Sequence, residues 1–161
     1  MQPMKKRKII LICSDGGHLA QILELKDLFT QYDYLIVTEK TTATSFLKEK
    51  YNVRYLKSRS KGDKRSIAFF LSLVANFVIS FRILLNHYPK VIITTGSHTA
   101  IPMCILGKVL FTKIVWILSY ARINTKAKSA SMIYPIADLF IVQWKSAQKL
   151  YPKSKYIGGI Y

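Results

Sequence analysis

The sequence is poor in acidic residues, cysteine and histidine, and each scarcity excludes a class of protein. Only 8 Asp and Glu oppose 25 Lys and Arg, so the net charge of the 161 residues is +17. The two cysteines, Cys13 and Cys104, lie in apolar runs. They form neither a disulfide framework nor a CxxC motif, which favours a reducing compartment. Because no His, Cys and carboxylate residues have the spacing of metal ligands, we expect no metal and no cofactor.

Common nucleotide motifs and targeting segments are missing as well. Neither a spaced G-x-G-x-x-G nor a Walker A loop occurs. The apolar run at residues 9–12 is too short for a signal peptide. The uncharged run at residues 66–81 is shorter than the roughly 20 residues that a membrane-spanning helix needs. Half of the residues are apolar, however, so the chain has the length and composition of one folded domain over residues 1–161.

Apolar runs that are typical of buried strands alternate with helical patterns along the chain. The predicted strands are residues 9–14, 34–37, 53–56, 91–95, 113–118 and 139–142, and the predicted helices are residues 19–29, 42–51, 66–85, 99–111 and 146–151, with a short helix within 124–134. Strands that are apolar throughout indicate a parallel sheet covered by helices on both faces. Right-handed crossovers then favour a Rossmann-like α/β fold with strand order 3-2-1-4-5-6.

Two turns that contain glycine follow strands 1 and 4, which are neighbours at the switch point of this order. Their residues are Asp15, Gly16, Gly17 and His18 in the first turn, and Gly96, Ser97, His98 and Thr99 in the second. Each turn leads into a helix, whose first N–H groups and positive dipole end suit a phosphate group. We therefore expect a diphosphate site in the crevice between the turns. Tight turns without a ligand are the alternative.

His18 is the candidate catalytic base of this crevice. A neutral imidazole at the first turn of a helix could take a proton from a sugar hydroxyl. A histidine that only caps the helix or packs the loop is an equally good interpretation, and Asp15 is the other candidate base or cap. Glu39 follows strand 2, where a dinucleotide-binding fold holds a ribose hydroxyl, but the missing glycine fingerprint disfavours that role.

Residues 57–81 combine a basic loop with an apolar helix and suggest contact with a membrane surface. A doubly wound sheet buries one face of a helix, whereas only Ser72, Asn76 and Ser80 break the apolar character of this one. We expect peripheral or monotopic attachment to the anionic, cytoplasmic face of the cell membrane. A fully buried core helix is the alternative. The residues predicted to face the membrane are Lys57, Arg59, Lys61, Lys64, Arg65, Phe69, Phe70, Leu73 and Phe77.

Four motifs in order resemble a known family. They are residues 14–19 (SDGGHL), residues 94–98 (TTGSH), residues 119–122 (SYAR) and residues 134–144 (YPIADLFIVQW). Together they resemble the smaller, membrane-associated subunit of two-part UDP-sugar transferases that act on lipid-linked oligosaccharides. The eukaryotic version helps to add the second N-acetylglucosamine to a dolichol-diphosphate sugar, and bacterial relatives of the CpsF, EpsE and PssD types serve capsule and exopolysaccharide synthesis. The first glycine turn is also similar to the acceptor-diphosphate loop of MurG-like enzymes.

This resemblance implies the N-terminal, acceptor-binding half of a GT-B glycosyltransferase. The implied partners are a separate donor-binding subunit and a polyprenyl-diphosphate-sugar acceptor, and the chain is expected to be inactive alone. Arg122, Gln143 and Trp144 belong to the family motifs. The apolar tail with Tyr156, Ile157, Ile160 and Tyr161 is expected to receive the partner, or else to form a last strand of this domain. The family's usual glutamate is replaced by Leu118 and its Gly-Arg pair by Ala130 and Ser131, which puts the contacts of those positions in doubt.

The charge distribution leaves a second class of function open. Residues 51–161 carry 17 basic and 2 acidic side chains, so this part of the chain should meet nucleic acid, an anionic membrane or a phosphorylated substrate. A basic nucleic-acid-binding module is the alternative, but no RNA- or DNA-binding motif occurs, and we expect no nucleic-acid partner. A free-standing nucleotide-dependent enzyme is disfavoured by the missing fingerprint and by a length that accommodates the acceptor half only.

Overall fold

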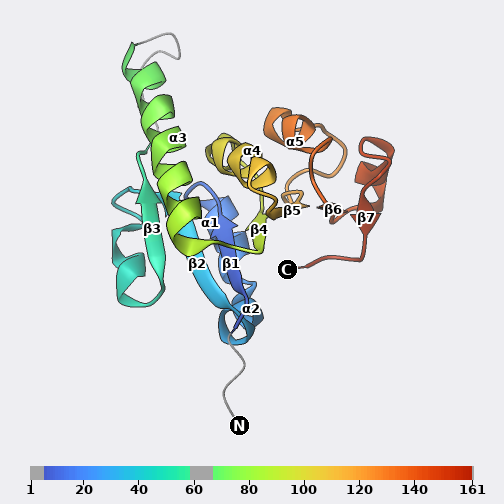
Figure 1. Ribbon diagram of the computed structural model, residues 1–161. Helices are drawn as coiled ribbons and strands as arrows, with labels where there is room; N and C mark the ends of the chain where they lie inside the picture. Colours follow the sequence, from blue (N-terminus) through green and yellow to red (C-terminus); the bar gives the residue numbers. More distant parts are fainter. Residues whose placement is uncertain (1–5, 59–66, 161) are drawn as a thin grey trace.

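The computed structural model describes residues 6–58 and 67–160, except for the side chains of residues 68–70. Seven parallel strands form one sheet in the order β3-β2-β1-β4-β5-β6-β7 (Figure 1). The strands are β1 Lys8–Ile12, β2 Asp33–Glu39, β3 Val53–Leu56, β4 Val91–Thr94, β5 Lys113–Ile117, β6 Leu139–Val142 and β7 Lys155–Tyr156. The predicted fold class and strand order are confirmed, and β7 extends the sheet by a strand beyond the predicted six.

Helices cover both faces of the sheet, as the apolar strands predict. They are α1 Gly17–Leu23, α2 Lys26–Gln31, α3 Ile67–His87, α4 Ile101–Val109 and α5 Lys128–Ile133, with 3-10 helices η1 Ser45–Glu49, η2 His98–Ala100 and η3 Lys145–Lys149. Side chains of α3, α4 and α5 pack in one core cluster, and those of α1, α2 and η1 pack in the other. The two cores therefore lie on opposite sides of the sheet. The carboxyl ends of the neighbouring strands β1, β4 and β5 lie at one edge of the sheet, where they border a crevice.

The helices predicted over residues 19–29 and 42–51 are interrupted or shortened because local hydrogen bonds compete with the helical ones. The helix predicted over residues 19–29 breaks at Leu25, whose ψ is 30° and whose N–H donates to the Ile22 carbonyl three residues back. The predicted helix over residues 42–51 is reduced to η1. There the Thr44 hydroxyl donates to the Glu39 carbonyl at 2.7 Å and accepts the Thr41 N–H at 2.9 Å, which diverts this segment from helical pairing.

Candidate functional site: a crevice at the switch point

The two glycine turns touch each other through a reciprocal pair of hydrogen bonds. Nδ1 of His18 lies 3.0 Å from the Thr95 carbonyl oxygen, and the Thr95 hydroxyl donates to the His18 carbonyl at 2.9 Å. A carbonyl oxygen only accepts, so Nδ1 carries the hydrogen and the lone pair of the neutral ring is on Nε2. The turns after β1 and β4 therefore share one crevice, as the strand order predicts, and His18 joins them.

The second turn has an unusual backbone that depends on glycine. Gly96 has φ of 110°, and a Cβ there would lie 3.2 Å from Cε1 of His18 and 3.4 Å from Cζ2 of Trp116. Ser97 follows with φ of 102° and ψ of 159°, a region that residues with a side chain rarely occupy. The Gly96 N–H donates to the Thr94 hydroxyl at 3.0 Å, which ties the turn to the end of β4. This geometry places the Gly96 backbone next to the His18 ring, with little space for a larger residue.

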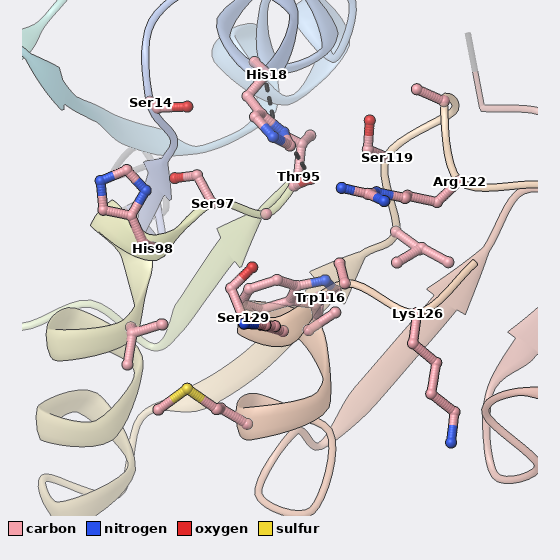
Figure 2. Close-up of a pocket in the computed structure, with 18 residues that line it drawn as sticks. Ser14, His18, Thr95, Ser97, His98, Trp116, Ser119, Arg122, Lys126 and Ser129 are labelled. Atoms are coloured by element: carbon pink, nitrogen blue, oxygen red, sulfur yellow. Dashed lines mark hydrogen bonds between the residues drawn. The ribbon is translucent and has the colours of Figure 1, made fainter.

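A cavity of about 800 Å³ opens next to the two turns. Its polar and charged lining comes from three places: the turns, the loop after β5 and the start of α5 (Figure 2). These side chains are Ser14, His18, Thr95, Ser97, His98, Ser119, Arg122, Lys126, Lys128 and Ser129. Trp116, Leu118 and Ala130 contribute apolar surface to the same cavity. The size and the mixed lining are those of a site for a small-molecule ligand.

The cavity is electrically positive and holds a neutral imidazole. Burial lowers the pKa of His18 below its usual value of 6.5 and outweighs the hydrogen bond to Thr95, while nearby Arg122 and His98 lower it further. His18 is therefore uncharged at neutral pH. Figure 2 shows the Arg122 guanidinium directed toward Ser119 and His18, whereas Lys126 extends away from the turns. A cation close to a neutral base suits an anionic ligand that also has a hydroxyl group to deprotonate.

Not every residue of the two predicted turns lines the cavity. Asp15, Gly16 and Gly17 stand outside its lining, and the two glycines are exposed with nothing within 4 Å of an added Cβ. Thr99 is buried, and its hydroxyl donates to the Glu39 carboxylate. His98 does line the cavity, and its Nε2 lies 3.9 Å from the same carboxylate. The Glu39 carboxylate, which follows β2, thus holds two residues of the second turn in place.

The family-motif residues take two different places. Arg122 lies in the cavity, whereas Gln143 and Trp144 donate hydrogen bonds to the carbonyls of Leu118 and Tyr120 and so hold the loop after β5. Both departures from the family pattern at positions 118 and 130 fall in the cavity lining, while position 131 is exposed.

Trp116, Lys126, Lys128 and Ser129 line the cavity but were not predicted as site residues, and Ser14, Thr95 and Ser119 were named only as parts of the family motifs. The available signal was topological, because the segment after strand 5 also begins at the carboxyl edge of the sheet that borders the crevice.

The predicted partner-docking tail begins as the last strand of the sheet. Tyr156 belongs to β7 and pairs with Val142, so the alternative of a closing strand holds for this residue. Tyr156 and Ile157 are nevertheless exposed, by 42% and 66% of their surface, and Ile160 is half-buried. Tyr161 lies outside the described residues. An apolar surface therefore remains on the tail.

Helix α3 turns its polar stripe and the side chains of Ile79, Ile83 and Leu84 toward the protein, whereas its other described bulky apolar side chains point outward. Ser80 is fully buried, and the Asn76 side chain exchanges two hydrogen bonds with the Lys57 backbone, at 2.8 and 3.0 Å. Ile67, Leu71, Leu73, Val74, Phe77, Val78, Phe81 and Leu85 are exposed. The described part of α3 is therefore not a fully buried core helix.

The rest of the predicted membrane-facing set is only partly described. Arg59, Lys61, Lys64 and Arg65 lie outside the described residues, as do the side chains of Phe69 and Phe70. Among the described residues, no helix is both long and apolar enough to cross a membrane.

Comparisons with known proteins agree with this architecture. The model of the family described as "Oligosaccharide biosynthesis protein Alg14 like" matches residues 9–160. The human UDP-N-acetylglucosamine transferase subunit ALG14 is 27% identical, with 98% of this chain and 85% of the relative aligned. The corresponding subunit of Candida albicans is 29% identical, with 96% of this chain and 81% of the relative aligned.

Solved structures share the fold at low sequence identity. MurG of Acinetobacter baumannii superposes with a TM-score of 0.76 at 14% identity, over 95% of this chain and 45% of that one. UDP-N-acetylglucosamine 2-epimerase of Rickettsia bellii gives a TM-score of 0.72 at 11% identity, over 96% of this chain and 45% of the epimerase. The chain thus spans a little under half the length of these structures and has the Rossmann-like fold of one GT-B half.

Proposed function

Because the family model covers nearly the whole chain, the protein belongs to the Alg14-like family of oligosaccharide biosynthesis proteins, and we propose that it is the acceptor-binding subunit of a two-subunit glycosyltransferase. In this proposal it binds a polyprenyl-diphosphate sugar and presents it to a separate subunit that binds a UDP-sugar. The observation that carries the proposal is the cavity in which His18 joins both glycine turns beside Arg122. UDP-N-acetylglucosamine is the proposed donor, since the relatives are named as its transferase subunits.

The diphosphate of the acceptor would bind where the two turns meet. The first turn of α1 leaves backbone N–H groups without helical partners, and no side chain occupies the space at Gly17. Arg122 faces this region from the loop after β5 (Figure 2), and Lys126 and Lys128 add positive charge to the lining of the same cavity. Guanidinium and backbone N–H donors together are a common phosphate-binding set.

His18 would act as the general base. Its Nε2 lone pair takes the proton of the acceptor sugar hydroxyl as that oxygen attacks the anomeric carbon of the donor, and the bond from this carbon to the UDP oxygen breaks. The low pKa keeps the imidazole neutral and ready to accept a proton at physiological pH. The Thr95 carbonyl holds the ring in the tautomer that this step requires.

The exposed side of α3 would rest on the cytoplasmic face of the membrane. Asn76 and Ser80 of α3 contact the protein, so the exposed apolar side chains of this helix would form a large surface in water. Contact with lipid would remove the unfavourable free energy of exposing this surface. Tyr88 and Phe111 extend this surface at the ends of α3 and α4, where they border a hollow together with Lys6, Arg7 and Lys90. These cations suit anionic headgroups and would help to attach the protein to the membrane surface.

Direct titration of the chain with a short-chain polyprenyl-diphosphate N-acetylglucosamine tests the proposed site. Gly17→Val places a branched side chain at the turn where the phosphate is proposed to approach, and no atom lies within 4 Å of the added Cβ. We expect at least a tenfold weaker acceptor affinity with an unchanged melting temperature. Ala20→Val, at an exposed position of the same helix, is the matched control and should bind normally. Equal affinity of folded Gly17→Val and wild type would refute the site.

A further inference from the structure

Three side chains from a short segment after β6 hold the loop that carries Ser119 and Arg122 into the cavity. Gln143 Nε2 donates to the Leu118 carbonyl at 3.0 Å, Trp144 Nε1 to the Tyr120 carbonyl at 2.7 Å, and Ser146 Oγ to the Ile123 carbonyl at 2.6 Å. We call Gln143, Trp144 and Ser146 the loop clamp. The carbonyls of the loop are thus bound on one side, while Ser119 and Arg122 line the cavity.

Gln143 differs from the other members of the loop clamp because it also binds the C-terminal tail. It is 3% exposed, and its Oε1 accepts the N–H of Ile160 at 3.1 Å. The Leu118 carbonyl only accepts and the Ile160 N–H only donates, so these two partners fix the orientation of the amide. One buried side chain therefore bridges the tail and the cavity loop, and it cannot move without disturbing both.

The described part of the tail has little backbone pairing. Strand β7 pairs with β6 only at Lys155 and Tyr156, opposite Ile141 and Val142, and beyond it the Ile160 N–H bonds the Gln143 amide. Tyr156 and Ile157 are exposed apolar residues on this segment. A partner that buried them would restrict the tail and, with it, the position of Ile160.

We propose that Gln143 is a positioning residue that couples the tail to the cavity loop, so that docking of the donor-binding subunit on the tail sets the placement of Ser119 and Arg122. The inference rests on the proposed function, because it takes the tail as the docking surface and the cavity as the acceptor site. Coupling between two sites is reciprocal. Acceptor binding should therefore strengthen partner binding by the same factor by which the partner strengthens acceptor binding.

The nearly isosteric variant Gln143→Glu makes the hydrogen bond to the Leu118 carbonyl depend on pH, while the bond from the Ile160 N–H can form at every pH. At pH 8 the ionised carboxylate still accepts the Ile160 N–H but has no hydrogen to donate to the Leu118 carbonyl. A buried glutamate has a raised pKa, so lowering the pH toward 6 protonates it and restores a donor. A residue with a merely structural role gives no such recovery of the coupling.

The measurement is acceptor affinity of the full chain, with and without the donor-binding subunit, using the short-chain polyprenyl-diphosphate N-acetylglucosamine as the probe. We expect the partner to tighten wild-type binding roughly fivefold, about the value of one neutral hydrogen bond. In Gln143→Glu the partner should still bind, but the tightening should disappear at pH 8 and return at pH 6. Ile160→Pro removes the tail N–H instead and should abolish the tightening at both pH values, which provides the test if Gln143→Glu does not fold.

Trp144→Phe is the matched control, because it keeps an aromatic ring next to Tyr120 and removes the indole N–H donor, while it leaves the Gln143 bonds in place. It should weaken acceptor binding equally with and without the partner and leave the tightening intact. A wild-type tightening that persists in folded Gln143→Glu at pH 8 would overturn the coupling while leaving the proposed function intact. A wild-type chain that binds neither the acceptor nor the partner would refute the proposed function itself.

Discussion

Replacement of His18 distinguishes a catalytic base from a residue that merely fastens two turns together. His18→Ala removes the ring and both of its possible roles. His18→Asn keeps a side-chain N–H that can donate to the Thr95 carbonyl but has no basic nitrogen. The hydrogen bond that the Thr95 hydroxyl donates to the backbone carbonyl of residue 18 can form in both variants. The pair of variants therefore separates proton transfer from anchoring.

The expected loss follows from the state of the ring. Since Nδ1 is committed to Thr95 and the pKa lies below 6.5, Nε2 of a neutral imidazole is the basic atom at pH 7. Removing a positioned general base costs on the order of 10²–10⁴-fold in rate, or roughly 3–5 kcal/mol of barrier. Wild-type kcat/KM should be level above pH 6.5. It should fall as the pH drops through the lowered pKa, because His18 then becomes protonated.

The assay is sugar transfer by the reconstituted pair, measured at saturating donor over pH 5–8. Both His18 variants should lose activity to a similar extent and lose the acidic limb of the profile, with the pair still assembled by size-exclusion chromatography. If His18→Asn retains most of the wild-type rate, His18 is an anchor between the turns and the assignment of the base is wrong.

Three further changes test the membrane surface, the second turn and the fold. The double variant Leu73→Ser with Phe77→Ser should release the folded chain from anionic vesicles in a flotation assay, whereas Phe46→Ser, which changes an exposed phenylalanine of η1, should not. The membrane proposal would be contradicted by unfolding of the double variant. It would also be contradicted if the wild-type chain co-sedimented with nucleic acid in a salt-sensitive way and did not bind vesicles. Gly96→Ala should cost about 1–3 kcal/mol in urea unfolding, because φ is 110° and the methyl group would lie 3.2 Å from an imidazole carbon; an unchanged midpoint would show that the turn relaxes freely. Burial opposes ionisation of Asp138, but hydrogen bonds from a backbone N–H and two lysines prevail and lower its pKa to about 2. Its stabilising effect is therefore complete above pH 4 and lost as the pH falls toward 2, so Asp138→Ala should cost about 1–3 kcal/mol at pH 7 and progressively less below pH 4; a pH-independent difference would contradict this.

The sheet could be predicted from the sequence because its signals are repeated and its connections are constrained. Continuous apolar runs mark buried parallel strands, and right-handed crossovers leave few orders for them. The break at Leu25 and the short η1 helix could not be predicted this way. They depend on single hydrogen bonds, such as the one from the Thr44 hydroxyl to the Glu39 carbonyl, that become visible only when the chain is folded.

Some residues of the candidate site could be predicted from the strand order, whereas others depend on how the helices pack. Glycine turns after neighbouring strands place His18 and Gly96 together on topological grounds alone. The opposite wall, with Lys126 and Ser129, depends on where α5 packs, and no periodic pattern in the sequence encodes that position. The orientation of α3 also required the structure, since a polar stripe alone does not say whether Asn76 faces solvent or protein.

We propose above that this chain supplies the acceptor half of a transferase and needs a donor-binding subunit for the other half. The direct measurement is transfer from UDP-N-acetylglucosamine to the lipid-diphosphate acceptor by the purified chain alone, by the donor-binding subunit alone and by the two together. We expect product only from the mixture, with no product from either component. Sustained sugar transfer by the purified single chain, with no second polypeptide present, would contradict the claim.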